Sequence, residues 1–505
     1  MAGNGRRVFC AAGEGGTGFG GFDPGKGALL EDSPDWEGRF ELFDTFDAEV
    51  AAAGGLLVST EAGLVLLGGT DMPAQPPAAP GFVARMPAGP VTEALSGPVS
   101  PLRALMAVAA GTALRRRLKL VDDEEKTLLR CELWELRPEA GTPVSLAVLS
   151  PLRGYEKAFR RAEAHFGAAA PLDAAEAAAL LRGPEAGLPA GPAEPMTADE
   201  TAFDAATGLI RDQLAIARCH EPGMIADIDT EFLHDYRVAL RRVRSVVSLF
   251  KGVFSEAQTE SLKSRFGALM ARTGRLRDLD VYLLEREQYM ALVPEARRGG
   301  IGKLFGRFAA ERDAEQRKLA AWIGTKGYAQ EIARLEKLFA KPKKLERGPE
   351  AERHALGYAR QLIWKRYRKV CKLAQGIGTC PDEQVHELRI HCKKLRYLME
   401  FFAPLFGEAE VKRLIKALKK LQDNLGLFND YSVQQVALEE AAAGIAADPG
   451  PETVEIAAAI GALVTVLHQR QRAERDRVAA SFAAFDSEGT RAEFRKLFNP
   501  GEDTA

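Results

Sequence analysis

LHDYRVALRRVRSVVSLF at residues 233–250 and VHELRIHCKKLRYLMEFF at residues 385–402 share one pattern, 152 residues apart. The two stretches align without a gap, so that His234 matches His386 near one end and Phe250 matches Phe402 at the other. The same offset aligns GRLRDLDV (274–281) with GLFNDYSV (426–433). Since one register spans two motifs, the sequence predicts a duplicated helical unit.

Apolar residues in both stretches recur at alternating intervals of three and four, which is typical of a helix with one buried face. In the two copies these residues are Leu233, Tyr236, Leu240, Val243, Val247 and Phe250, and Val385, Leu388, Cys392, Leu395, Met399 and Phe402. We call these two apolar rows the seams. Each stretch is therefore expected to be one long helix packed along its seam.

A basic row follows each seam by one position, and one residue is about 100° of rotation on an α-helix. The rows, with the cations beside them, are His234, Arg237, Arg241, Arg242 and Arg244, and His386, Arg389, Lys393, Lys394 and Arg396. A merely solubilising face lies opposite the seam more often than beside it. This position predicts that both rows line a groove next to the helix packing.

A second basic row occurs in the C-terminal copy only. Lys412, Lys416 and Lys419 each follow an apolar residue, whereas the first copy has Glu260, Ser264 and Gly267 at the matching positions. If both copies contribute to one site, the C-terminal copy is expected to bind more strongly. A third row, Lys365, Arg368, Lys369 and Lys372, precedes His386.

Rows of Arg and Lys suit phosphate, because guanidinium and ammonium groups make charge-assisted hydrogen bonds to its oxygens. A linear polyanion on such rows releases counterions, so its affinity falls steeply with salt. His234 and His386 donate to phosphate when protonated, or serve as structural groups at the helix edge. Asp278 and Asp430 are interpreted as structural acceptors, since carboxylates repel a polyphosphate.

Charge is unevenly distributed along the 505 residues, although the net charge is only -2. Residues 1–200 hold 18 Lys and Arg against 28 Asp and Glu, while residues 201–440 hold 43 against 32. The middle of the chain therefore favours an anionic partner. The six cysteines form no CxxC pair, and no apolar stretch is long enough for a membrane span, so we expect no metal, no disulfide, no membrane and a cytoplasmic protein.

The composition predicts an α+β multidomain chain. Residues 1–182 alternate like short strands between glycines and prolines, 183–200 form a Pro/Gly/Ala-rich linker, and 201–500 are helical throughout. The helical part divides into halves at 201–340 and 351–500. Two four-helix bundles related by a pseudo-twofold axis are the economical architecture.

HDYRVALRRVRS, RDLDV, HELRIHCKKLRY and LQDNLGLFND, in this order, resemble the CHAD family, the conserved histidine α-helical domain, over about 201–500. The resemblance implies an all-α domain of two four-helix bundles around a basic channel that binds inorganic polyphosphate, often on polyphosphate granules. It places the binding positions on the two basic rows defined above, and it implies no catalysis and no cofactor.

The front part resembles a degenerate CYTH domain, a β-rich triphosphate tunnel or barrel, in FELFDTFDAEVAAAGGLLVS (40–59) and RRRLKLVDDEEKTLLRCELWEL (115–136). The ExExK strand with which that family holds metal and triphosphate is missing, so we expect a scaffold or protein contact and no enzyme. The alternatives are a triphosphatase or nucleic-acid binding by the basic helices, for which a recognised reading motif is lacking. The triphosphatase would use Arg115, Arg117, Lys119 and Arg130 on phosphate and Glu132 on a metal.

Overall fold

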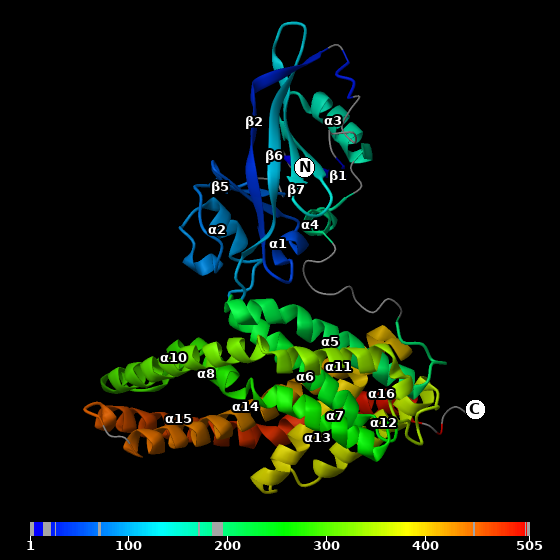
Figure 1. Cartoon of the computed structure of the whole chain (residues 1–505), viewed down its shortest axis with the longest axis vertical. Helices are drawn as coiled ribbons and strands as arrows, with labels where there is room; N and C mark the ends of the chain where they lie inside the picture. Colours follow the sequence, from blue (N-terminus) through cyan, green and yellow to red (C-terminus); the bar gives the residue numbers. More distant parts are fainter. Residues whose placement is uncertain are drawn as a thin grey trace. The chain divides into compact units, whose positions relative to one another are not determined.

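The computed structural model (Figure 1) describes residues 5–13, 22–25, 27–68, 72–169, 172–183, 195–447, 450–499 and 501. Contacts divide the chain into two compact units, Met1–Leu188 and Pro189–Ala505. Most of the expected linker, residues 184–194, lies outside the described residues. The expected fold class is confirmed, because an antiparallel sheet precedes an all-helical part.

The first unit is built on an eight-stranded antiparallel sheet with the order β1-β8-β7-β6-β2-β3-β4-β5. The strands are β1 (Arg7–Ala12), β2 (Ala28–Asp44), β3 (Leu56–Thr60), β4 (Gly63–Leu67), β5 (Ala74–Gln75), β6 (Met106–Val121), β7 (Thr127–Pro138) and β8 (Val144–Pro151). The long strands β2 and β6 pair with register shifts at three places along β2. Such irregularities bend and twist a strand, which lets these long strands curve.

Short helices cover this sheet: α1 (Glu49–Ala52), α2 (Pro90–Leu95), α3 (Glu156–Ala169) and α4 (Ala174–Arg182). Helix α3 packs on β1, β7 and β8 through Ala162 and Phe166 (Figure 1). The first unit thus has its own apolar core on both faces of the sheet.

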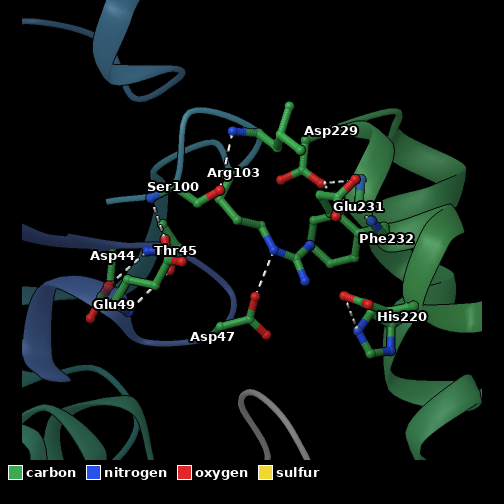
Figure 2. A network of polar contacts seen from close by, with 12 residues as sticks. Asp44, Thr45, Asp47, Glu49, Ser100, Arg103, His220, Asp229, Glu231 and Phe232 are labelled. Carbon is green, nitrogen blue, oxygen red and sulfur yellow. Dashed lines mark hydrogen bonds and ion pairs between the residues drawn. The ribbon is translucent and has the colours of Figure 1, made fainter. Parts of the chain in front are cut away.

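Asp44, at the end of β2, anchors the turn into α1. Its carboxylate accepts hydrogen bonds from the backbone N–H groups of Thr45 and Val50, and Figure 2 shows this turn. Burial raises the pKa of Asp44, although the Arg182 guanidinium, 2.8 Å away, opposes that shift. The Phe-Asp-Thr segment therefore has a structural role, tying α4 to the end of β2.

The second unit consists of helices. They are α5 (Ala202–Ala226), α6 (Thr230–Leu249), α7 (Glu256–Ala271), α8 (Gly274–Leu284), α9 (Arg286–Leu292), α10 (Glu295–Ile323), α11 (Lys326–Ala340), α12 (Ala355–Leu373), α13 (Asp382–Phe401), α14 (Glu408–Ala447), α15 (Thr453–Phe485) and α16 (Glu488–Phe498). Helix α10 lies beside α15 (Figure 1). In the described part of the chain, the helices are too short or too polar to cross a bilayer.

The duplication is visible in the helix boundaries. Helix α13 begins and ends 152 residues after α6, and α14 begins 152 residues after α7. The copies differ further on, because the first copy breaks between α7 and α8 whereas α14 continues as one helix of 40 residues.

Both seams are buried as predicted, with every seam residue at most 4% exposed. At the start of α6, the Asp229 carboxylate accepts from the N–H groups of Glu231 and Phe232, an N-cap also drawn in Figure 2. At the other end, Phe250 stacks on Phe402 with the ring centroids 4.8 Å apart. Since these two residues are matched in the repeat, the copies meet through equivalent positions.

Candidate functional site

A cavity of about 280 Å³ lies between α6 and α13, the two repeated helices. Its charged lining residues are all cations: Arg241, Arg244, Arg389, Lys393 and Lys394. Ser245, Ser248 and Tyr397 add hydroxyl groups, and the described lining contains no carboxylate. Because each copy supplies some of these cations, the cavity depends on the duplication.

A second cavity of about 700 Å³ adjoins the first, since Arg241 lines both. It is enclosed by α6, α8 and α14, with His234, Arg237, Arg275 and Arg277 as its other basic side chains. Carboxylates also line it: Asp278, Glu285, Asp430 and Glu440. We refer to the two cavities together as the basic channel.

Positive charges crowd one another in this channel. Burial, together with the neighbouring Arg241 and Arg389, lowers the pKa of Lys393 to about 8. Burial and the nearby Arg241 also lower the pKa of Arg237. Desolvated cations in mutual repulsion are unfavourable, and a bound anion would relieve that repulsion.

The side chain of Arg237 is fixed by hydrogen bonds to residues at the break between α7 and α8. Its guanidinium donates to Thr273 Oγ1 at 2.6 Å and to the Met270 carbonyl at 3.4 Å. Thr273 is fully buried and precedes α8. In the second copy the equivalent Arg389 lies 3.8 Å from the carboxylate of Asp430. The helix break therefore gives Arg237 neutral acceptors in addition to the nearby carboxylate of Asp278.

The two histidines occupy different surroundings. His386 is exposed, and its Nδ1 lies 2.8 Å from Asn429 Oδ1. His234 is half-buried and lines the larger cavity. Arg277 replaces Asn429 in the first copy and donates to the Thr230 carbonyl at 3.4 Å. Repeat symmetry is thus not kept around the histidines.

Arg242 and Arg396 point to a shared carboxylate. Their guanidinium nitrogens lie 3.8 and 3.7 Å from Glu400, and Arg242 also lies over the ring of Phe401. Neither arginine lines the basic channel. In this arrangement Arg242 joins α6 to α13, whereas Arg396 contacts Glu400 within α13.

Lys412, Lys416 and Lys419 are exposed on α14 and do not line either cavity of the channel. Lys412 forms an ion pair with Glu408 one turn before it, at 2.5 Å. The structure therefore separates this row from the cations of α6 and α13 that it brings together.

Asp278 and Asp430 line the channel beside its cations. Asp430 accepts a hydrogen bond from the Asn429 side chain at 3.4 Å. Burial raises the pKa of Asp278, against the effect of the neighbouring Arg237 and Arg275. Both carboxylates are thus placed to orient arginines, in line with the structural role that the sequence suggested.

Arg275 and Arg277 line the channel but do not belong to the basic rows. They lie in GRLRDLDV, and the second copy carries Leu427 and Asn429 at their positions. Comparison of the two copies therefore gave no signal for them. The sequence did contain one signal for them, namely two arginines two residues apart in a motif already assigned to the repeat.

The first unit has a charged cavity of its own, about 580 Å³ in volume. It is lined by Arg117, Arg130, Glu132 and Asp32, among others, and Arg117 lies 3.4 Å from Glu132. The remaining two predicted cations, Arg115 and Lys119 on β6, do not line this cavity. Arg115 lies over the rings of Trp36 and Trp134, and Lys119 is 3.8 Å from Asp32. Among the described residues, no cluster of three or more His, Cys, Asp and Glu side chains could hold a metal ion.

Residues 208–439 match the CHAD domain family. Of the solved structures, a CHAD domain from the plant Ricinus communis is similar at 23% identity and a TM-score of 0.46, over 60% of this chain and 95% of that one. PptA from Streptomyces chartreusis is similar at 15% identity and a TM-score of 0.43, over 56% and 99% of the two chains. No curated protein matches.

Proposed function

We propose that this chain, which carries a CHAD domain at residues 208–439, binds inorganic polyphosphate in the basic channel between α6 and α13. The observation that carries the proposal is the lining of the smaller cavity, whose charged side chains are all cations and come from both copies of the repeat. A linear chain of phosphates offers one negative charge after another, and so it can neutralise several of these cations at once.

The channel has the physical properties that such a ligand requires. Lys393 and Arg237 are partly desolvated and repelled by other cations, so part of the desolvation cost is already met before binding. Serine and tyrosine hydroxyls at the smaller cavity supply further donors. Within the described basic rows aromatic side chains are few, which disfavours stacking of nucleic-acid bases.

Isothermal titration of the full chain with long-chain polyphosphate tests the proposal. We expect binding whose affinity falls by about a thousandfold between 50 and 200 mM salt, the range for six or more phosphate contacts. Single-stranded DNA at equal phosphate concentration should displace the polymer poorly. No binding at low salt would refute the proposal, and ready displacement by DNA would make nucleic acid the better ligand.

Polyphosphate affinity should fall between pH 7 and pH 9. Lys393, with a pKa of about 8, is charged below that pH and mostly neutral one unit above it, which weakens binding by up to about tenfold. In Lys393→Arg the guanidinium stays charged, so this variant should lose much less affinity over the same range. An equal loss in both proteins would show that Lys393 is not the titrating group.

In this proposal the chain has no catalytic activity and takes no cofactor, and it associates with polyphosphate granules. The first unit serves as a scaffold or protein contact. Imaging a tagged chain in cells with and without granules tests the location, because a diffuse signal in both would contradict it.

The cavity of the first unit supports a second candidate, phosphate chemistry on the sheet. Arg117 and Arg130 could hold phosphate there, with Asp32 and Glu132 as the carboxylates of the same cavity. Phosphate release from tripolyphosphate with Mg²⁺ or Mn²⁺ separates the two. Turnover that is lost in Glu132→Ala would establish a hydrolase and contradict a purely binding function.

A further inference from the structure

A group of cations lies beside the basic channel, on the side of α13 that packs against α12. It consists of Arg366 and Lys369 on α12, Lys394 on α13, and Lys251 directly after α6. We call these four residues the α12 patch. They are close enough for Arg366 and Lys251 to lower the pKa of Lys394, after the larger effect of burial.

The patch has little compensating negative charge. Arg366 Nη1 lies 2.9 Å from Nδ1 of His391, so its partner there is an imidazole and not a carboxylate. Burial and the cations Arg366, Lys394 and Lys369 lower the pKa of His391 to about 4, which keeps that ring neutral at pH 7. For these four cations the described contacts provide one carboxylate, Glu387, at 3.3 Å from Lys369. The patch therefore carries excess positive charge.

Lys394 connects the patch to the channel, because it also lines the smaller cavity. The larger cavity, by contrast, is lined by Glu285, directly after α8, and by Glu440 on α14. Glu285 follows Asp278 by seven residues, or about two helical turns. A polyanion thus meets carboxylates within the larger cavity, whereas it meets cations where it leaves the smaller cavity beside Lys394.

The patch belongs to one copy of the repeat only. The positions that match Arg366 and Lys369 in the first copy are Leu214 and Ala217, at most 2% exposed. The position that matches Lys394 is Arg242, which is engaged by Glu400. The patch is therefore a feature added to the duplicated channel and not a consequence of the duplication.

We propose that the α12 patch is a second binding segment for the polymer, which continues from the channel over Lys394 onto Arg366 and Lys369. The inference rests on the proposed function, and it predicts that the protein prefers long polyphosphate chains to short ones. Chains long enough to span the channel and the patch gain contacts that tripolyphosphate cannot reach, and they bind more tightly for that reason.

The double variant Arg366→Gln/Lys369→Gln tests this in the full chain. We expect it to lose on the order of tenfold in affinity for long-chain polyphosphate, and to change its affinity for tripolyphosphate by less than about twofold. For the long polymer, the logarithm of the association constant plotted against the logarithm of the salt concentration should also give a slope that is shallower by about one to two. Titration calorimetry of both ligands at two salt concentrations supplies these values.

Arg334→Gln/Lys337→Gln on α11 is the matched control. It removes one Arg and one Lys that are likewise three positions apart. Both control residues are exposed, and neither lines a cavity of the channel. The control should bind both ligands like the unchanged protein. Equal weakening by the two double variants would overturn the inference, as would an unchanged affinity for the long polymer. If the unchanged protein binds neither ligand, the proposed function itself fails.

Discussion

Replacement of Arg237, Arg241, Arg389 and Lys393 by glutamate should abolish polyphosphate binding, with a loss of at least about a thousandfold. Each of these side chains lines the basic channel, and a hydrogen bond to a charged group contributes about 1.5 to 3 kcal/mol. Four such contacts are lost, and four carboxylates then repel the polymer. Calorimetric titration at low salt, where the unchanged protein binds most tightly, measures the effect.

The control for this variant carries the same change in charge on another surface. Arg317, Lys318, Arg334 and Lys337 are exposed on α10 and α11, and none of them lines the channel. Their replacement by glutamate should weaken binding far less, because exposed charges more than about 10 Å away are largely screened at 0.1 M salt. Similar losses in both quadruple variants would mean that net charge, not the channel, determines affinity.

Arg237 needs a separate check, since it also bonds to Thr273 and to the Met270 carbonyl. The smaller variant Arg241→Glu/Lys393→Glu leaves those bonds intact. It should retain the circular dichroism and melting temperature of the unchanged protein and still lose at least about a hundredfold in affinity. Normal binding by this folded variant would place the polymer outside the channel.

Replacement of Phe402 by alanine should lower the free energy of unfolding of the helical unit by about 3 to 5 kcal/mol. Phe402 is fully buried, stacks on Phe250 and meets Tyr358 edge-on. A truncated ring leaves a cavity where the two copies of the repeat meet. Urea unfolding followed by helical circular dichroism gives the change.

Val433→Ala is the control for the Phe402 variant, because Val433 is 58% exposed on α14. Exposed substitutions of this kind change stability by less than about 0.5 kcal/mol. The double variant Phe250→Ala/Phe402→Ala should cost less than the sum of the single changes, since each ring is the other's neighbour. A loss below about 1 kcal/mol in Phe402→Ala would show that the stack is not important for stability.

Periodicity along a single helix was enough to predict α6 and α13. The three- and four-residue spacing identified all the seam residues as buried. The 152-residue offset of the repeat also separates the first residues and the last residues of the two helices. Rotation by one residue also placed Arg241 and Lys393 beside the seam, where they line the channel. These features depend on local geometry, which the sequence of one helix contains.

The residues that each basic side chain contacts could not all be predicted from periodicity. Arg242 lies in a basic row of α6, yet it meets Glu400 of α13, and this contact depends on how α6 crosses α13. Lys412 pairs with Glu408 on its own helix. The break before α8, which holds Arg237, has no counterpart in α14. The contact of Arg242 and the break before α8 arise from packing between helices, on which a pattern along one helix carries no information. The pairs Arg396–Glu400 and Lys412–Glu408, by contrast, follow a four-residue spacing that the sequence of one helix contains.

The unequal lining of the two cavities, in which the larger one takes all its basic side chains from the first copy, has a consequence for the orientation of a bound polymer. A polyphosphate chain reads the same from either end, whereas a nucleic-acid strand has distinct 5′ and 3′ directions. In an unequally lined channel, a polymer that is the same from both ends still makes the same contacts in either sense, which contributes RT ln 2, or about 0.4 kcal/mol, relative to binding in one sense only. A strand of DNA or RNA would make different contacts when reversed, so the unequal lining favours a polymer without direction.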